Sequence, residues 1–443
     1  MRIRLSDHFT LGRLLRFAIP SVVMMVFTSI YGVVDGIFVS NYAGKTAFAA
    51  VNLVMPVLMI FGVPGFMLGT GGTALIAKNL GEGNHKKAND IFSMLTLICV
   101  IFGVVLTAVG LLTTRPVSVM LGAEGQMLED CVLYGLLVIP ATTAYILQFA
   151  FQSFCVAAEK PNLSLAMMVT AGVCNIVLDA LFVAVFKWGL AGAAIATSVA
   201  QIVGALIPVI YFCRPNKSLL QFGRFQFDGK ALLRSCTNGS SELMSNLSMN
   251  LVSVLYNFQL MRYAGENGIA AYGVIMYVNF MFLSVFIGFS VGTAPIVGFN
   301  HGADNKAEQK SLFRKSMLII GTVSVVMAAS AILLSDPLSR IFVGYDQTLC
   351  EMTARGFRIY ALSFLICGFN IYGSAMFTAF NNGLVSAAIS FVRTLFCQSA
   401  AVLLLPLIWE LDGVWFAIVA AELAALLLTA FCLVKYRKHY HYL

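Results

Sequence analysis

Charged side chains are scarce in this sequence. Of its 443 residues only 11% are Asp, Glu, Lys or Arg, whereas 59% are hydrophobic. Soluble domains carry about 25% charged residues. So few charges cannot cover the surface of a water-soluble protein, and the loops between the apolar stretches are too short to bury a core of their own. The composition therefore predicts a membrane protein without a separate soluble domain.

Patterned cysteine and histidine are also missing. The ten cysteines and five histidines are scattered, with no C-x-x-C pair and no cluster at metal-ligand spacing. Most of the cysteines fall in apolar stretches, where a thiol packs as a small hydrophobic side chain. We therefore expect no disulfide, no metal and no cofactor.

Catalytic motifs are missing as well, with one formal exception. The sequence has no H-E-x-x-H and no P-loop. Residues 288–292 spell G-x-S-x-G around Ser290, but a nucleophile elbow needs a strand–turn–helix context, and this one lies in an apolar run. In the internal repeat described below, Met67 takes the place of Ser290. We expect the protein not to be an enzyme.

Long apolar runs are what the sequence has instead. About 20 helical residues cross the roughly 30 Å of hydrocarbon in a bilayer. Twelve runs reach this length: 15–40, 47–77, 91–113, 131–156, 163–186, 190–213, 238–262, 268–298, 315–334, 354–380, 384–408 and 412–434. The chain is thus predicted to be an all-α membrane protein with twelve transmembrane helices.

Basic residues are distributed unevenly between the two sides of these spans. Of 28 Lys and Arg residues, 20 fall on the side of both termini, 7 on the other side, and Arg393 lies inside a span. Since basic loops stay in the cytoplasm, we predict a multi-pass protein of the cell membrane with both termini cytoplasmic. The asymmetry accounts for the net charge of +8, so no nucleic-acid partner is expected. The basic N-terminus leads directly into a full-length span, which predicts that no signal peptide is cleaved.

Short motifs recur at a nearly constant interval. Tyr42-Ala43-Gly44 returns as Tyr263-Ala264-Gly265, a shift of 221 (263 − 42), and Gly65-x-x-x-Gly69 returns as Gly288-x-x-x-Gly292, a shift of 223 (288 − 65). Six spans in each copy give both copies the same orientation, as in transporters built from parallel repeats. The repeat predicts two six-helix bundles, 1–213 and 235–443, related by a pseudo-two-fold axis along the membrane normal and joined by a cytoplasmic linker, 214–234. The paired glycines are expected to let helices approach closely.

The two copies differ in their acidic residues. Asp35 lies opposite Tyr256, and Asp179 lies opposite an alanine, so both carboxylates belong to the first copy only. At 1.5 Å per residue each carboxylate is roughly 10 Å from the outer end of its span, taken as Asn41 and Lys187. We therefore expect the two at one depth and close together.

Asn175 lies one helical turn before Asp179 and shares its face of the helix. A charge inside hydrocarbon is costly, so a carboxylate there by default marks a proton or ion path. Burial and a neighbouring carboxylate both favour the protonated acid, and the same oxygens suit a monovalent cation. We predict a coupling site for H⁺ or Na⁺ at Asp35, Asn175 and Asp179. The alternative is structural, with each aspartate only bonding a neighbouring helix or lying near the wet interface.

Other polar residues inside spans are candidates either for substrate contact or for hydrogen bonds between helices. The substrate candidates are Gln148, Gln152, Thr197, Asn257 and Asn370. Glu422 occupies the repeat position of Gln201, and recurring polarity favours a structural role there. Arg393 must find a carboxylate, a carbonyl or water, and the sequence does not indicate which. The role of Glu242 stays open.

Together these features resemble the MATE (multidrug and toxic compound extrusion) family, and within it the MepA-like group of bacterial transporters. The resemblance covers essentially the whole chain. It rests on Val34-Asp35-Gly36-Ile37-Phe38-Val39, Ala49-Ala50-Val51-Asn52, Gly81-Glu82-Gly83-Asn84 and Ala158-Glu159-Lys160-Pro161. It implies a V-shaped pair of bundles that exports cationic, amphipathic drugs by alternating access in exchange for H⁺ or Na⁺, and hence a link to antibiotic resistance.

The resemblance also implies where coupling occurs. In the DinF-like branch, an acidic residue of the first helix and an Asn-x-x-x-Asp pair of the fifth form the cation site, and these correspond to Asp35, Asn175 and Asp179. The NorM-like branch uses acidic residues of the seventh and tenth helices, but the matching places here, near Asn250 and Asn370, are not acidic. Coupling in the first half is therefore favoured.

Two other functions stay open. One is a lipid-linked oligosaccharide flippase of related fold, for which a more strongly basic central cavity is expected. The other is a membrane scaffold or sensor that transports nothing and needs no buried ionisable pair. In every case we expect a monomer surrounded by membrane lipid.

Overall fold

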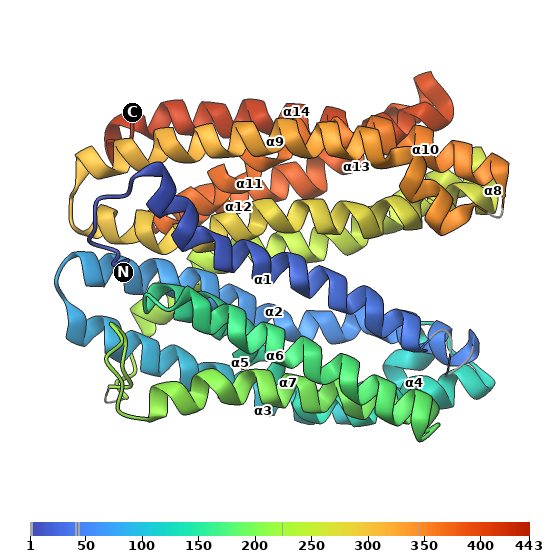
Figure 1. Ribbon diagram of the computed structural model, residues 1–443, viewed down its shortest axis with the longest axis horizontal. Coiled ribbons are helices and arrows are strands. Elements are labelled where there is room, and N and C mark those ends of the chain that lie inside the picture. Colours follow the sequence, from blue (N-terminus) through green and yellow to red (C-terminus); the bar gives the residue numbers. More distant parts are fainter. Residues whose placement is uncertain (1–2, 40–41, 43–44, 224, 345) are drawn as a thin grey trace.

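The computed structural model describes residues 3–39, 42, 45–223, 225–344 and 346–443, and within these ranges the protein is helical, without strands (Figure 1). The first half holds α1 Leu11–Phe38, α2 Lys45–Gly81, α3 His85–Met120, α4 Gly125–Val138, α5 Thr142–Ala157, α6 Pro161–Asp179 and α7 Gly189–Cys213. The second half holds α8 Gly229–Gly302, α9 Lys306–Val343, α10 Gln347–Ala361, α11 Phe364–Ala379, α12 Gly383–Phe391, α13 Gln398–Leu404 and α14 Pro406–Tyr440.

Short irregular turns divide several of these spans without ending them. The 3₁₀ turn Ile139–Ala141 joins α4 to α5, the π-helical turn Ala180–Val185 continues α6, and the π-helical turn Val392–Cys397 joins α12 to α13. α10 and α11 follow each other with a bend of 48° and together have the length and hydropathy of one span. In the described part of the chain, ten helices and this bent pair are long and apolar enough to cross a membrane.

α8 accounts for two of the twelve predicted spans. Its 74 residues would extend roughly 110 Å as one straight helix, more than three times the thickness of the hydrocarbon. At Gly265 the backbone takes φ 61° and ψ −148°, a conformation that glycine adopts without steric cost. Figure 1 shows the chain doubling back there. Counting α8 twice confirms the twelve transmembrane helices.

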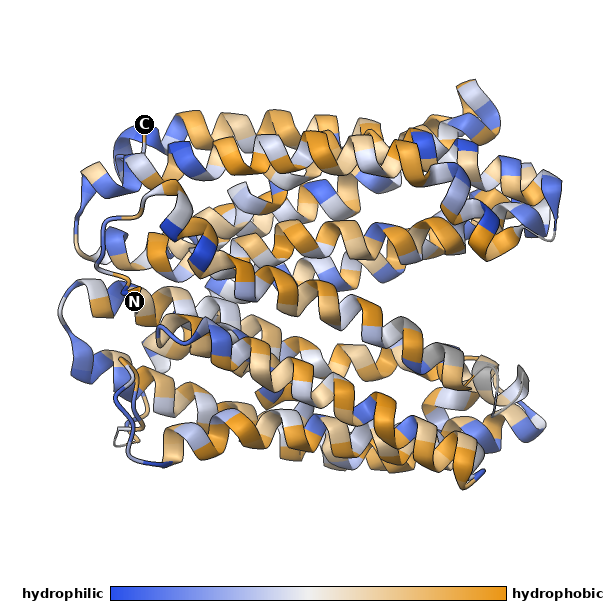
Figure 2. Cartoon of the chain, viewed as in Figure 1, coloured by the Kyte–Doolittle hydropathy of each residue, from blue (hydrophilic) through white to orange (hydrophobic). Residues whose placement is uncertain are grey.

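The helices form two bundles, α1–α7 and α8–α14 (Figure 1). Both termini and the segment between α7 and α8 lie at one end of the molecule, and the bundles diverge toward the opposite end. Figure 2 shows hydrophobic residues along the middle of the helices and hydrophilic residues gathered at the two ends. This distribution is the one expected for a protein embedded in a bilayer.

Glycines allow the bundles to touch at the end that carries the termini. A Cβ on Gly239 would lie 1.9 Å from the carbonyl oxygen of Met67, and a Cβ on Gly302 would lie 2.0 Å from that of Lys78. Both sites bring α8 against α2, backbone to backbone. Any side chain at these positions must push the helices apart, because a backbone carbonyl cannot rotate out of the way.

The paired glycines of both copies confirm the predicted close packing, but the helix that they pack against differs between the copies. In the first copy, a Cβ on Gly65 would lie 2.3 Å from the carbonyl oxygen of Ile146, which belongs to α5 of the same bundle. In the second copy, a Cβ on Gly288 would lie 2.6 Å from Cα of Val22, which belongs to α1 of the other bundle. Ser290, between Gly288 and Gly292, therefore lies in the middle of a helix and not in a nucleophile elbow.

A testable consequence concerns Gly239. We expect Gly239→Ala to destabilise the protein by about 1–3 kcal/mol, because the added methyl group overpacks the contact between α2 and α8. Gly273→Ala is the matched control, since Gly273 lies on the same helix and a Cβ there has no atom within 4 Å. The control should be neutral or slightly stabilising. Thermal unfolding of the detergent-purified variants measures the difference, and equal midpoints would contradict the role of the contact.

The segment before α1 joins the two bundles at the same end. The backbone N–H of Leu5 donates to Glu159 Oε1 of the first bundle at 2.8 Å, and that of Phe9 donates to Glu308 Oε1 of the second bundle at 2.9 Å. His8 Nδ1 lies 2.6 Å from Glu308 Oε2. These residues therefore tie the bundle ends together.

The segment between the bundles is docked against α3. The backbone N–H of Gln221 donates to Asn89 Oδ1 at 3.0 Å, and the ring of Phe222 stacks on that of Phe92 at 4.9 Å. α8 begins at Gly229, so the last residues of the predicted linker, 229–234, are helical. A polar composition did not indicate this because most residues of the first turns of α8, 229–234, are exposed and lie before the apolar stretch.

Candidate cation-coupling site

α6 places Asn175 and Asp179 on one buried face. Pro161 begins the helix at a position where its missing N–H is not needed. Asn175 and Asp179 follow one turn apart, with 3% and 0% of their surfaces exposed. Asp179 is the last residue of α6, and the π-helical turn Ala180–Val185 starts directly after it. π-helical turns are rare and occur frequently at functional sites.

α1 supplies the second carboxylate. Asp35 is buried in the last turns of α1, which packs against α6. Gly172, one turn before Asn175, makes this contact close, since a Cβ there would lie 2.5 Å from the ring of Phe27 on α1. The Asp35 carboxyl group lies within interaction distance of the side chains of both Asp179 and Asn175. The structure thus brings the three predicted residues together.

Among the residues that the structure describes, several polar atoms of this cluster have no hydrogen-bond partner. They are Asp35 Oδ1, both carboxylate oxygens of Asp179, and Asn175 Nδ2. Two ionised carboxylates accept hydrogen bonds but donate none, so Asp35 and Asp179 can bond each other only when one carries a proton. A buried polar atom without a partner is costly. The cluster is therefore incomplete as it stands and would be stabilised by a proton or a cation.

Aromatic hydroxyl groups surround the pair. Tyr31 on α1 lies near Asp35, and Tyr134 on α4 lies near both aspartates. Thr197 on α7 lies beside Tyr134. The sequence made Thr197 a candidate for substrate contact or for a hydrogen bond between helices, and it did not indicate Tyr134. The available signal was a lone tyrosine near the start of an apolar span, which is common at membrane interfaces and thus not specific.

Asp35 and Asp179 were predicted to lie at one depth, and one of the two reference points for that depth lies outside the described residues. Asn41, taken as the outer end of the first span, is not among them, and α1 ends at Phe38. Lys187 follows the π-helical turn that ends at Val185. Asp35 and Asp179 each lie within a few residues of the end of a span at the same side of the bundle, which agrees with the predicted shared depth.

The substrate candidates lie in different surroundings. Gln148 and Gln152 on α5 are buried, and Gln148 Nε2 lies 3.2 Å from Met168 Sδ. Asn257 on α8 is half-buried. Asn370 on α11 is 0% exposed and bonded within the second bundle. Asn250, at the other position considered for coupling, is exposed and donates to the backbone of Asn246. Substrate contact by any of them stays a prediction.

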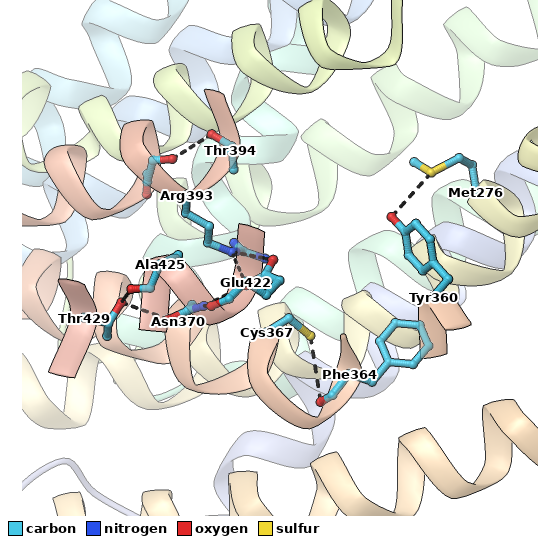
Figure 3. A network of polar contacts seen from close by, with 11 residues as sticks. Met276, Tyr360, Phe364, Cys367, Asn370, Arg393, Thr394, Glu422, Ala425 and Thr429 are labelled. Atoms are coloured by element: carbon cyan, nitrogen blue, oxygen red, sulfur yellow. Dashed lines mark hydrogen bonds and ion pairs between the residues drawn. The ribbon is translucent and has the colours of Figure 1, made fainter. Parts of the chain in front are cut away.

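The second bundle holds a different polar cluster (Figure 3). Arg393, in the π-helical turn between α12 and α13, points at Glu422 on α14, and its Nη2 lies 2.8 Å from Glu422 Oε1. Asn370 Nδ2 donates to Glu422 Oε2 at 2.7 Å, and Thr429 Oγ1 donates to Asn370 Oδ1 at 2.9 Å. Glu422 is thus the partner of Arg393 that the sequence did not indicate.

No group of three or more His, Cys, Asp or Glu side chains that could hold a transition metal occurs in the part of the chain that the structure describes. The two aspartates and one asparagine instead form a small, oxygen-rich cluster. Oxygen ligands suit hard cations.

The two bundles are parallel repeats of each other, and both hold ionisable residues buried inside their spans. This architecture is that of secondary transporters. A family model, MatE, matches residues 20–181 and 243–401. The chain therefore belongs to the MatE family of multidrug efflux transporters, whose members are transporters and not enzymes.

Curated relatives agree with this assignment. The chain is 23% identical over 425 residues to the multidrug export protein MepA of Staphylococcus saprophyticus. The alignment covers 93% of this chain and 91% of that protein. It is 24% identical over 406 residues to MepA of Staphylococcus aureus strain NCTC 8325, in an alignment that covers 90% of this chain and 89% of that protein. The resemblance to the MepA-like group is confirmed.

Solved structures share the fold. A crystal structure of a MATE protein in complex with MaL6 superposes with a TM-score of 0.92 at 22% identity, covering 97% of this chain and 98% of that one. An outward-facing multidrug resistance MATE transporter gives a TM-score of 0.91 at 21% identity, with the same coverage. The predicted twelve helices and pseudo-two-fold arrangement are confirmed.

Proposed function

We propose that this protein is a secondary antiporter that exports cationic, amphipathic compounds in exchange for H⁺ or Na⁺. The observation that carries the proposal is the buried, unsatisfied cluster of Asp35, Asn175 and Asp179 in the first bundle. Relatives that are multidrug export proteins support the substrate class. The proposal includes no resident cofactor and no metal centre.

The chemistry of the cluster suits a reversible cation. With one proton shared, Asp35 and Asp179 become a hydrogen-bonded pair; with Na⁺, their oxygens become ligands. With neither, two carboxylates stand together out of water, which is unfavourable. Loading and unloading the cation therefore change the local free energy strongly. That change is what can bias a conformational equilibrium.

Coupling requires that the cation bind one conformation more tightly than the other. We infer that the cation reaches Asp35 and Asp179 when the bundles open outward, and that its binding there favours release of the exported compound. The contacts of Gly239 and Gly302 with α2, and of residues 5–9 with Glu159 and Glu308, would have to break for the opposite opening.

The orientation belongs to the same proposal. The excess of Lys and Arg on the side of the termini places that side in the cytoplasm, and a bacterial export protein of this kind acts in the cell membrane. The end at which the bundles touch would then face the cytoplasm, and the end at which they diverge would face outward (Figure 1). The transporter would act as a monomer.

The polar candidates would serve the exported compound. Thr197 and Asn257, which are only partly buried, are the candidates that can contact a substrate without rearrangement. Gln148, Gln152 and Asn370 are buried and would contact it only after the helices around them move. A cationic compound needs apolar walls more than hydrogen bonds, and methionine adapts to many shapes.

Dye transport by the purified protein in lipid vesicles tests the proposal. With an ethidium-like dye and an imposed pH or Na⁺ gradient, we expect uphill transport driven by one of the two gradients and lost when that gradient is dissipated. Asp35→Asn should lose the gradient dependence. A flippase would move a lipid-linked sugar and ignore the dye, and a scaffold or sensor would move neither. Either outcome would overturn the proposal.

A further inference from the structure

The carboxylate of Glu422, in the second bundle, has several polar partners. It differs in this from the carboxylates of Asp35 and Asp179 in the first bundle. Glu422 is 1% exposed. Its Oε1 lies 2.8 Å from Arg393 Nη2 in an ion pair and accepts a hydrogen bond from Arg393 Nε at 2.9 Å. Its Oε2 accepts from Arg393 Nε at 3.0 Å and from Asn370 Nδ2 at 2.7 Å (Figure 3). Both oxygens are thus engaged by the guanidinium, and Oε2 is also engaged by the amide of Asn370.

The residues around this pair are held in place themselves. Asn370 Nδ2 also donates to the backbone oxygen of Glu422 at 3.0 Å, and Thr429 Oγ1 fixes the amide by donating to Asn370 Oδ1 at 2.9 Å. Asn370 is 0% exposed. The amide therefore cannot rotate away to make room for an incoming ion without breaking three hydrogen bonds.

The local backbone structure positions Arg393 beside Glu422. A π-helical turn, Val392–Cys397, interrupts the span between α12 and α13. Such a turn inserts one residue and so shifts which side chains face inward. The side chain of Arg393 is only 14% exposed and ends on α14. The guanidinium of Arg393 is thus a permanent cation inside the second helix bundle.

The repeat shows that this pair is an addition of the second copy. At a shift of 222, Arg393 corresponds to Ala171 (393 − 222) and Asn370 to Gln148 (370 − 222), and at a shift of 221 Glu422 corresponds to Gln201 (422 − 221). The first copy thus has an alanine and two amides where the second has an ion pair. A buried ion pair adds little stability compared with apolar side chains, so stability alone does not account for it.

We propose that Arg393 is a built-in counter-cation that keeps the oxygens of Glu422 occupied, so that Glu422 exchanges neither H⁺ nor Na⁺. Arg393 then excludes Glu422 from ion exchange, whereas Asp35 and Asp179 stay available for it. This proposal rests on the proposed antiport function and specifies its ion site.

The physical reasons differ for the two ions. A proton on Glu422 would leave the guanidinium of Arg393 buried without a counter-charge, which is strongly unfavourable. A sodium ion would find both oxygens of Glu422 already engaged and would be repelled by the guanidinium at short range. Asp179, by contrast, has two oxygens without a hydrogen-bond partner in the described part of the chain.

Carbodiimide labelling tests the proposal on the intact protein in lipid. Dicyclohexylcarbodiimide is apolar and modifies membrane carboxyl groups in their protonated form, and peptide mass spectrometry locates the label. In the wild-type protein we expect label on Asp35 or Asp179 that grows as the pH falls, and at least about tenfold less on Glu422 at each pH. Equal labelling of Glu422 and the aspartates would overturn the proposal.

Arg393→Met provides the second arm. Removing the guanidinium should let Glu422 take up a proton, and we expect its labelling to rise at least about tenfold to the level of the aspartates. In R393M/E422Q the new label should disappear while the aspartates keep theirs. Unchanged labelling of Glu422 in R393M would overturn the proposal. If R393M does not fold, the labelling of the wild-type protein and the ion-to-dye ratio of R393M/E422Q still decide.

The two proposals fail in different ways. Absence of pH-dependent label on both aspartates, together with dye transport unaffected by Asp35→Asn, would remove the coupling site in the first bundle. Label on Glu422 in the wild-type protein, with the aspartates still reactive, would remove only the role of Arg393. A change of the ion-to-dye ratio in R393M/E422Q would also count against that role alone.

Discussion

Asp179→Asn abolishes ion-driven efflux: we expect uphill dye transport in vesicles to fall by at least about tenfold, to the level of passive leak. Asn keeps the size of the side chain but cannot carry the charge that a proton or Na⁺ neutralises. The cluster would then have nearly the same free energy with and without the cation, and a ligand without a preference for one conformation shifts no equilibrium.

The matched control for this prediction is Asp304→Asn. Asp304 lies in an exposed turn with φ 51°, a backbone conformation that asparagine tolerates well, so the same chemical change is made outside the membrane. The control should transport like the wild-type protein. Dye binding to Asp179→Asn, measured without a gradient, should persist. Near-normal uphill transport in both Asp179→Asn and Asp35→Asn would rule out coupling in the first bundle.

Glu422→Gln is expected to cause the largest loss of stability among the substitutions considered. It leaves the guanidinium of Arg393 buried without a counter-charge, and breaking a buried pair from one side costs roughly 3–5 kcal/mol. Unfolding by titration with a denaturing detergent measures the loss. R393M/E422Q, which removes both charges, should recover most of it because neither remaining side chain is charged.

An exposed ion pair serves as the control. Arg115 Nη2 lies 3.3 Å from Glu129 Oε1, with both side chains more than half exposed. Glu129→Gln should leave the unfolding midpoint unchanged, because exposed pairs are screened by water and salt. A loss as large as that of Glu422→Gln would show that the effect is not one of burial. Equal stability of Glu422→Gln and the double variant would contradict an uncompensated charge.

The candidate site shows which kinds of inference a sequence allows in a membrane protein. Asp35, Asn175 and Asp179 could be selected because a carboxylate is conspicuous among apolar residues and because only one copy of the repeat carries it. Tyr134 could not be selected, since tyrosine is ordinary near the end of a span. Glu422 was recognised as a buried polar position, but its partner lies 29 residues away on another helix.

The two copies of the glycine motif make a similar point. Both were predicted to allow close packing, and both do, but Gly65 packs within one bundle and Gly288 packs between the two. A short motif encodes how closely a neighbour can approach and not which neighbour it is. The neighbour depends on how twelve helices are arranged, which involves contacts between residues far apart in the chain.

The sequence by itself determined that this is a membrane protein of two six-span halves, because hydrophobic length and the period of a repeat are local or linear properties that burial in lipid makes obligatory. It also determined which carboxylates have no counterpart. Only the tertiary structure decided that Asp35 and Asp179 remain unsatisfied side by side while Glu422 is neutralised by Arg393. Whether a buried charge has a partner depends on distances of a few ångströms across helices, and Coulomb energy at that range decides between an exchangeable site and a permanent ion pair.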